Sequence, residues 1–239
     1  MASAPPTVSA VRARLLGEIA QLIPLPAHPD GVRVAVDGVD GVGKSTFARQ
    51  LSATVSDSGR AVVHVSADDF HHPRVRRHAR GRDSPEGFWL DSYDHEALVS
   101  DVLRPFGPGG SRRFRPAVHD LDTDAVLDAP WHTAAPGTVL VVDGLFLHRD
   151  ELRDCWEFSL FLDAPVRTTV ARMARRDGSH PDPSHPSLAR YLGGQRLYAA
   201  ACDPRRRATI VVDNTDLDRP TIVDVHRRPP TPAPEGPTA

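Results

Sequence analysis

Five short hydrophobic runs are spaced along the chain, and each ends at or just before an aspartate. In the first run Val32, Val34 and Val36 alternate with other residues, whereas the run at 138–143 is apolar on both faces. Alternation predicts a strand, and a run that is apolar on both faces is typical of a central parallel strand. The predicted strands are 31–37, 61–66, 138–143, 157–163 and 208–213.

The segments between these runs have apolar residues at helical spacing, as Phe47, Leu51 and Val55 do. Strands that alternate with helices predict an α/β fold: a doubly wound, parallel, five-stranded sheet with helices on both faces. Ligands are then expected beyond the carboxyl ends of the strands, where the aspartates lie. The predicted helices are an N-terminal helix at about 9–23, then 46–55, 95–106, 165–176 and 186–202.

The first predicted strand leads into Gly38-Val39-Asp40-Gly41-Val42-Gly43-Lys44-Ser45, which fits the phosphate-binding P-loop G-x-x-x-x-G-K-[ST]. Lys44 is the only lysine in the chain, beside 28 arginines. A flexible ammonium reaches between phosphates in a way that a planar guanidinium cannot. We therefore expect a P-loop NTPase that binds ATP, with Lys44 on the β- and γ-phosphates. The predicted nucleotide-binding residues are Gly38, Asp40, Gly41, Val42, Gly43, Lys44, Ser45 and Thr46.

Three acidic positions follow predicted strands. Asp143 ends the most apolar run and is followed by glycine, which is the expected position of a carboxylate that holds Mg²⁺ together with Ser45. Asp68 and Asp69 follow the second strand. One of them is expected to face the γ-phosphate and to accept a proton from an acceptor hydroxyl.

Composition narrows the function further. A formal charge of −2 argues against a nucleic-acid binder that works by bulk attraction. The five arginines between Arg74 and Arg82 lack interleaved aromatics and are expected to form a solvated loop beside the acceptor site. Cys155 and Cys202 are far apart, so neither a disulfide framework nor a zinc site is expected, which fits a cytoplasmic protein. No secretory signal or membrane span is expected either.

Four segments resemble the uridine kinase branch of the phosphoribulokinase/uridine kinase family: 36–47, 68–71, 91–98 and 142–144. They occur in the same order and at comparable spacing, and the similarity runs from about residue 31 to 214. The D-x-F-[HY] element and the downstream Y-D-H segment are more specific than the P-loop. The resemblance implies ATP and Mg²⁺ as cofactors and transfer of the γ-phosphoryl group to the 5′-hydroxyl of uridine or cytidine. It also implies a small lid at about 172–186.

The resemblance also implies roles for individual residues. Asp68 would be the catalytic base, Asp94 would hold the ribose hydroxyls, and His71 takes the place of a tyrosine in the nucleoside pocket. Arg172 and Arg176 would act with Lys44 as catalytic cations, because they fall where the family has lid arginines that clasp the transferring phosphate. The implied acceptor-site residues are Asp69, Phe70, His71, Asp94 and His119.

The chain departs from the family at four positions: Asp69 replaces serine, Asp143 replaces glutamate, His119 replaces tyrosine and Asp124 replaces histidine. The last two positions read the pyrimidine, so the acceptor stays open to pantothenate, nicotinamide riboside or a sugar. A P-loop ATPase with conformational output and a binding protein without catalysis are the alternatives from other classes.

In outline, we expect one kinase domain at 1–227 and a disordered, proline-rich tail at 228–239. The expected partner is a small-molecule substrate, with no nucleic acid and no membrane. A homo-oligomer is compatible with the sequence.

Overall fold

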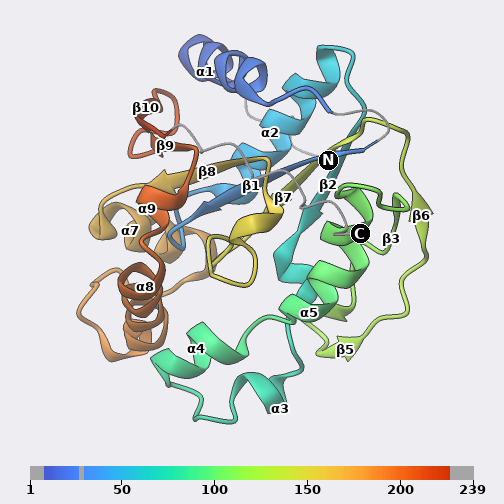
Figure 1. Cartoon of the computed structure of the whole chain (residues 1–239). Helices are drawn as coiled ribbons and strands as arrows, with labels where there is room; N and C mark the ends of the chain where they lie inside the picture. Colours follow the sequence, from blue (N-terminus) through green and yellow to red (C-terminus); the bar gives the residue numbers. More distant parts are fainter. Residues whose placement is uncertain (1–7, 27–29, 227–239) are drawn as a thin grey trace, which may run out of the picture.

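The computed structural model describes residues 8–26 and 30–226, so the predicted tail at 228–239 lies outside the described residues. One six-stranded sheet runs through the molecule in the order β10-β9-β8-β1-β7-β2 (Figure 1). The strands are β1 (Val32–Gly38), β2 (Val62–Ser66), β7 (Val139–Asp143), β8 (Phe158–Asp163), β9 (Ile210–Asp213) and β10 (Thr221–Val225). Two short antiparallel pairs join β3 (Arg113–Phe114) to β6 (His132–Thr133), and β4 (His119–Asp120) to β5 (Ala125–Val126); only the second pair is a hairpin.

All five predicted strands are confirmed, and they pair in parallel. The sixth strand, β10, was not predicted. It pairs antiparallel with β9 at the sheet edge, and its register shifts between Ile222 and Asp224. Most of its residues are exposed, so it lacks the buried run that marks the other strands. The fold is thus an α/β sheet of the P-loop NTPase kind with one additional edge strand.

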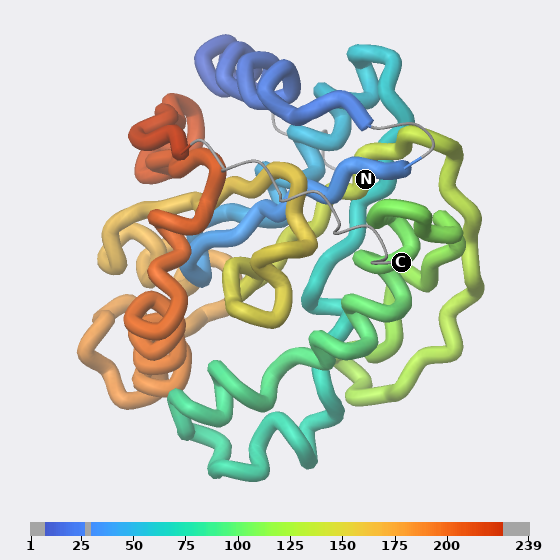
Figure 2. The backbone as a smooth tube through the Cα atoms, viewed as in Figure 1, coloured from blue at the N-terminus to red at the C-terminus, as the bar shows by residue number. Residues whose placement is uncertain are grey.

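The five predicted helices are present in the predicted order. The helices are α1 (Ala10–Leu22), α2 (Lys44–Asp57), α3 (Arg74–Arg77), α4 (Pro85–Asp91), α5 (His95–Leu98), α6 (Arg104–Phe106), α7 (Val166–Asp177), α8 (Ala189–Cys202) and α9 (Pro204–Arg207). Of these, α3, α4 and α9 were not predicted, and α3 replaces part of the solvated loop expected between Arg74 and Arg82. Short 3₁₀ segments lie at Ala67–Phe70, Arg153–Cys155 and Pro186–Leu188. Figure 2 shows the backbone from α3 to β6 as one continuous green stretch beside the sheet.

The helix predicted at 95–106 forms, but a π-helical turn at Val99–Leu103 interrupts it. Pro105 has no N–H to donate to the carbonyl of Asp101. That carbonyl instead accepts a hydrogen bond from the N–H of Arg115 at 3.1 Å. The irregular turn therefore joins this helix to the strand β3.

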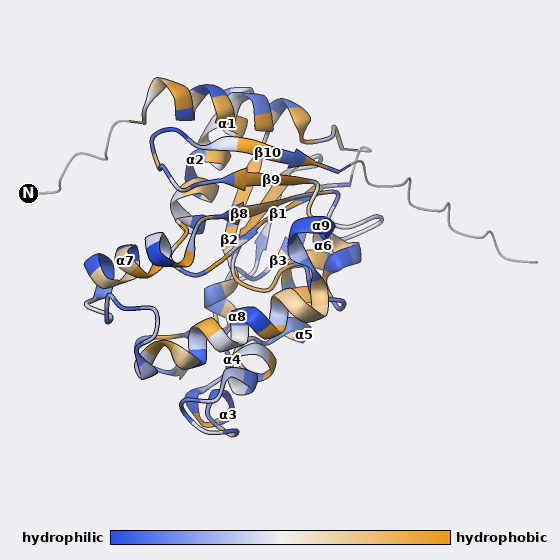
Figure 3. Ribbon diagram, turned by 90° about the vertical axis from the view of Figure 1, so that its left-hand side faces the viewer, coloured by the Kyte–Doolittle hydropathy of each residue, from blue (hydrophilic) through white to orange (hydrophobic). Residues whose placement is uncertain are grey.

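Helices cover both faces of the sheet, as predicted (Figure 3). On one face α1 and α2 pack against β1 through Leu16, Ile19, Phe47 and Leu51, all of which are buried. On the other face the helices between 95 and 106 and α8 form a second cluster; its members include Leu98, Val102, Phe106, Tyr198 and Cys202. The two apolar layers hold the strand ends in fixed positions.

α4 and α8 approach each other closely, through glycine in α8. A Cβ on Gly194 would lie 2.6 Å from Cδ1 of Phe88 and 3.0 Å from the carbonyl oxygen of Pro85. This packing attaches the segment after β2 to the segment after α7, which are the two parts of the chain beside the predicted acceptor site and lid.

We predict that Gly194→Ala lowers the free energy of unfolding by about 1–3 kcal/mol, because the added methyl group overpacks the α4–α8 contact. Gly17→Ala in α1 is the matched control. No atom lies within 4 Å of the added Cβ there, so the higher helix propensity of alanine should stabilise the protein by about 0.5–1 kcal/mol. Urea unfolding of both variants measures the two changes, and a stabilising Gly194→Ala would show that the helices separate at little cost.

Candidate active site

The loop between β1 and α2 borders a cavity of about 410 Å³. Gly41 and Gly43 have φ angles of 74° and 99°, a region that residues with a Cβ rarely adopt. A Cβ on Gly41 would lie 2.5 Å from the carbonyl oxygen of Thr169. α2 begins at Lys44, and no side chain caps it. The N–H groups of its first turn are therefore available to an anion.

The structure brings most of the predicted nucleotide-binding residues to this cavity. The lining includes Asp40, Gly41, Gly43, Lys44, Ser45 and Thr46. Gly38 and Val42 do not line it: a Cβ on Gly38 would meet the Leu162 carbonyl at 2.4 Å, and Val42 is fully buried. The ammonium of Lys44 donates to the carbonyl of Val39 at 3.1 Å, so it lies back across the loop.

Ser45 and Asp143 contact each other at the carboxyl end of β7. The Ser45 hydroxyl donates to Oδ2 of Asp143 at 2.6 Å, and Nε2 of His64 lies 2.7 Å from Oδ1. Asp143 is only 1% exposed. Hydroxyl and carboxylate oxygens suit Mg²⁺, which takes one or two protein ligands and completes its shell with water and phosphate oxygens. The pair fits that ion, although the described residues contain no group of three or more His, Cys, Asp or Glu that could hold a metal.

Asp68 lines the same cavity as Lys44 and Ser45. The hydroxyl of Tyr93 donates to Oδ1 of Asp68 at 3.1 Å. Burial, reinforced by the charge of Asp68, raises the pKa of Tyr93 well above its ordinary value, so the phenol remains a donor. This contact fixes the orientation of the Asp68 carboxylate toward the P-loop.

Asp69 does not line the P-loop cavity. Burial raises the pKa of Asp69, and the nearby charges of Asp68 and Asp143 raise it further. Its main-chain carbonyl accepts from the N–H of Val118 at 3.0 Å, which anchors the β4–β5 hairpin. Of the two candidate bases, Asp68 is the one that lines the P-loop cavity.

The two sequence segments around His71 and Tyr93 lie side by side. An antiparallel bridge pairs His71 with Tyr93, and the N–H of Asp94 donates to the carbonyl of Phe70 at 2.7 Å. The rings of His71 and Tyr93 are 4.2 Å apart. Burial lowers the pKa of His71, so the ring is expected to be neutral at pH 7. Phe70 itself is fully buried and packs in the core.

Asp94 lies at the start of α5, where Oδ1 accepts from the N–H of Ala97 at 2.9 Å. Its Oδ2 lies 3.7 Å from Nδ1 of His72. This carboxylate is half-buried and is oriented by its role as the cap of the helix.

His119 and Asp124 lie on the β4–β5 hairpin and face each other. Nε2 of His119, a side chain that is 2% exposed, is 3.2 Å from Oδ1 of Asp124. That oxygen also accepts from the N–H of Arg74 at 2.8 Å and from the guanidinium of Arg77 at 3.2 Å. Two of the four residues that depart from the family pattern therefore lie against each other, and Asp124 attaches the arginine-rich segment to the hairpin.

The two predicted lid arginines both line the cavity, with different contacts. Arg172 donates to the carbonyls of Asn214 at 3.0 Å and Thr215 at 2.8 Å. Arg176 is exposed, pairs with Asp177 at 2.8 Å and lies 4.0 Å from Asp40. Arg172 thus bonds main-chain carbonyls beside the cavity. The guanidinium of Arg176 instead lies near the carboxylate of Asp40 in the P-loop.

Sequence reasoning missed a buried polar cluster behind the P-loop. Oδ1 of Asp37 accepts from the N–H of Gly38 at 2.7 Å, and Oδ2 accepts from Nδ1 of His148 at 2.8 Å and from the hydroxyl of Tyr198. All three side chains are less than 5% exposed. The available signal was an aspartate inside an otherwise apolar strand; nothing in the sequence indicated its partners.

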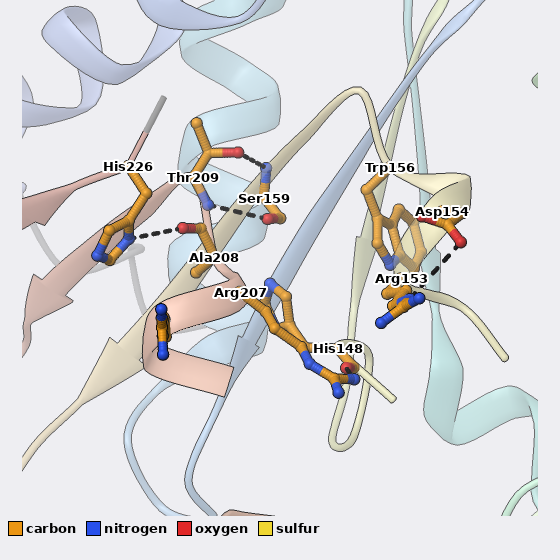
Figure 4. A pocket seen from close by; sticks show the side chains of 10 residues that line it. His148, Arg153, Asp154, Trp156, Ser159, Arg207, Ala208, Thr209 and His226 are labelled. Atoms are coloured by element: carbon orange, nitrogen blue, oxygen red, sulfur yellow. Dashed lines mark hydrogen bonds and ion pairs between the residues drawn. The ribbon is translucent and has the colours of Figure 1, made fainter. Parts of the chain in front are cut away.

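A second cavity, of about 280 Å³, lies near the amino ends of β8 and β9 (Figure 4). None of the residues predicted from the sequence lines it. Arg207 donates to the carbonyl of His148 at 2.9 Å and pairs with Asp150 at 2.7 Å. Arg153 lies 3.6 Å from Asp154. Most of the residues predicted to bind a nucleotide line the P-loop cavity and none of them lines this one, so the P-loop cavity remains the candidate active site.

Comparisons with known proteins agree with this fold. No model of a known protein family matches the chain, and no curated protein matches it. Among solved structures, one described as a possible uridine kinase from Bacillus stearothermophilus is 22% identical, with a TM-score of 0.64 over 84% of this chain and 96% of that one. One provisionally described as a fructose transport system kinase from Silicibacter is 23% identical, with a TM-score of 0.65 over 80% and 95%.

A third similar structure is D-glycerate 3-kinase from Cryptococcus neoformans, which is 11% identical, with a TM-score of 0.56 over 90% of this chain and 96% of that one. At these identities the likeness shows the fold: the chain is an α/β protein of the P-loop NTPase class. Among the helices of the described residues, none is both long enough and apolar enough to cross a membrane.

We predict an acid-sensitive stability that depends on His95, which lies beside Tyr93 and Asp94. Burial and the adjacent Arg149 guanidinium lower the pKa of His95 to about 3. The unfolded chain takes up this proton near pH 6.5, whereas the folded protein resists it until about pH 3. The free energy of unfolding should therefore fall as the pH decreases from about 6.5 to about 3.

His95→Gln keeps an acceptor for Arg149 and removes the titration, so the melting temperature should decline less steeply over that pH window. His132→Gln, at an exposed position, is the control and should leave the slope unchanged. Melting curves at intervals of pH measure the effect, and equal slopes for His95→Gln and the parent protein would contradict it.

Proposed function

We propose that this protein is an ATP-dependent small-molecule kinase that moves the γ-phosphoryl group to a hydroxyl group of its acceptor. The first candidate acceptor is the 5′-hydroxyl of uridine or cytidine. The observation that supports the proposal best is the position of Asp68, whose carboxylate lines the same cavity as Lys44 and Ser45. A phosphate site and a general base in one cavity are what hydroxyl phosphorylation requires.

The P-loop supplies the phosphate-binding part of the site. The uncapped N–H groups at the start of α2 and the ammonium of Lys44 would bind the β- and γ-phosphates. Main-chain N–H groups at a helix N-terminus need no reorganisation to meet negative charge. The phosphoryl group is therefore held in place before the acceptor arrives.

Ser45 and Asp143 would hold Mg²⁺, since their oxygens meet at 2.6 Å in a nearly buried position. When bound, the ion supplies positive charge that offsets the charge of the phosphate oxygens. His64 hydrogen-bonds the other oxygen of Asp143 at 2.7 Å. That contact would keep Oδ2 directed toward Ser45.

Asp68 would accept the proton of the acceptor hydroxyl. Tyr93 occupies Oδ1 at 3.1 Å, and within the described residues Oδ2 has no hydrogen-bond partner. Oδ2 is therefore the atom available to the hydroxyl. As the proton moves to Oδ2, the acceptor oxygen gains the electron density with which it attacks the γ-phosphorus.

Arg176 would stabilise negative charge on the transferring group. Its guanidinium lines the cavity, lies 4.0 Å from Asp40 and is exposed, with only the surface residue Asp177 as a close partner in the described part of the chain. Arg172 would contribute indirectly, through the main chain that it holds. The segment at 172–186 is the candidate lid that excludes water as a competing acceptor.

The choice of a pyrimidine ribonucleoside follows from the resemblance of the segments 68–71 and 91–98 to uridine kinases. The similar structures carry different descriptions: a possible uridine kinase, a fructose transport system kinase and D-glycerate 3-kinase. The pair of His119 and Asp124 stands where the family reads the pyrimidine. Pantothenate, nicotinamide riboside and simple sugars are therefore the alternative acceptors.

The test is ADP release by the purified protein with Mg²⁺ and ATP, alone and with uridine, cytidine, nicotinamide riboside, pantothenate, fructose or D-glycerate. We expect slow hydrolysis without acceptor and strong stimulation by uridine or cytidine. If only another compound stimulates ADP release, that compound is the acceptor, and the proposed mechanism of phosphoryl transfer still holds. An ATPase that no hydroxyl compound stimulates would contradict the kinase proposal and favour a conformational output.

We predict that Asp68→Asn lowers turnover by about 100-fold or more and leaves the Kd for ATP nearly unchanged, because an amide cannot accept the hydroxyl proton. Asp69→Asn is the matched control, since Asp69 neighbours Asp68 but does not line the cavity. Steady-state kinetics with the active acceptor measures both. If Asp69→Asn abolishes turnover and Asp68→Asn does not, Asp69 is the base.

A further inference from the structure

Arg12 of α1 is a buried arginine that lies outside the residues predicted for the site. Its side chain is 4% exposed. A buried guanidinium is costly unless its N–H groups are bonded. Nε donates to Oε1 of Gln50 at 2.6 Å, and Nη1 donates to Oδ1 of Asn214 at 3.1 Å and to the carbonyl of Leu217 at 2.9 Å. The guanidinium also lies over the ring of Phe47, 5.0 Å from its centroid.

Two of the three hydrogen-bond partners of Arg12, Asn214 and Leu217, belong to the segment 214–217, which follows β9 and lies beside α1 (Figure 2). Further bonds fix this segment from other sides. The side-chain amide of Asn214 donates to the carbonyl of Val42 in the P-loop at 2.7 Å. Arg172 of α7 donates to the carbonyls of Asn214 and Thr215. Two arginines, one from α1 and one from α7, thus hold the same four residues against the P-loop.

The segment 214–217 borders the nucleotide cavity at Leu217. Leu217 lines the cavity together with Thr46 and Arg49. A Cβ on Gly43 would lie 3.4 Å from Nδ2 of Asn214 and 3.6 Å from Cδ2 of Leu217. Leu217 is a large apolar side chain that is 43% exposed, so it offers an apolar contact to the ribose or base of a nucleotide whose terminal phosphates lie at Lys44.

We propose that Arg12 is a positioning residue for the phosphate donor: it orders the segment 214–217 so that Leu217 contacts the nucleoside part of ATP. The N-terminal helix thereby contributes to the selection of the nucleotide without touching it. This inference depends on the proposed function, because it takes the cavity to bind ATP. In this arrangement the segment 214–217 contacts the nucleoside part of ATP, and the P-loop binds the phosphates.

The test compares two ligands of the same cavity by isothermal titration calorimetry: ATP with Mg²⁺, and inorganic tripolyphosphate with Mg²⁺. Arg12→Gln loses the charged donor to Asn214 and Leu217, so the Kd for ATP should rise about 10-fold or more. The Kd for tripolyphosphate should change less than about 2-fold, because the P-loop binds it alone. In steady-state kinetics, the KM for ATP should rise and the KM for the acceptor should stay unchanged.

Arg14→Gln is the matched control, since Arg14 lies on the exposed side of the same helix and should leave both Kd values unchanged. Arg12→Lys retains the charge with fewer donors, and its Kd for ATP should rise by an intermediate, roughly 3-fold, factor. If Arg12→Gln does not fold, Arg12→Lys carries the test with the same two ligands.

Equal weakening of ATP and tripolyphosphate would overturn the inference, because it would indicate a general disturbance of the P-loop. Unchanged ATP binding in Arg12→Gln would also overturn it while leaving the proposed function intact. Failure of the parent protein to bind ATP would instead refute the proposed function, and the inference with it.

Discussion

The parallel register of β1, β7 and β2 is the constraint on which the candidate site depends. β7 lies between the other two strands, and Asp143 is opposite both Val36 of β1 and Ser66 of β2. The P-loop and the segment of Asp68 therefore leave the sheet at the same level as the carboxylate of Asp143. A shift of one residue would turn the side chain of Asp143 to the other face. Because β7 is buried along its whole length, this register is strongly specified.

Beyond the ends of the strands, main-chain groups have no partners in the sheet and form hydrogen bonds with side chains instead. Asp37 accepts from the N–H of Gly38, and Asn214 and Arg172 bond the main chain around the P-loop. Buried main-chain polar groups need such partners. The shape of the phosphate-binding loop thus depends on residues of α7 and of the segment after β9 that are distant in the sequence.

The two halves of the site differ in how they are built. The phosphate half is formed by main-chain groups and a helix end, whose geometry depends little on which side chains surround it. The proposed acceptor half consists of side chains of short, irregular segments, joined by the bridge between His71 and Tyr93 and by the contact of His119 with Asp124. Substitutions at this half change what it can bind without changing the fold. For that reason the proposed reaction class depends less on these side chains than the proposed acceptor does.

The sequence by itself determined the five parallel strands, their order with the helices, and the P-loop, because periodicity and motif spacing act over a few neighbouring residues. It also indicated that Asp143 and Asp68 follow strands, and the register brought both beside Ser45. Only the tertiary structure decided that β10 adds an edge strand, and that Asp68 rather than Asp69 lines the cavity. The contacts of Arg12, Arg172 and the cluster of Asp37, His148 and Tyr198 were decided there as well. These contacts join residues up to about 200 positions apart. Such pairings leave no local pattern, because they arise from which buried polar atoms remain unsatisfied once the sheet and helices have packed.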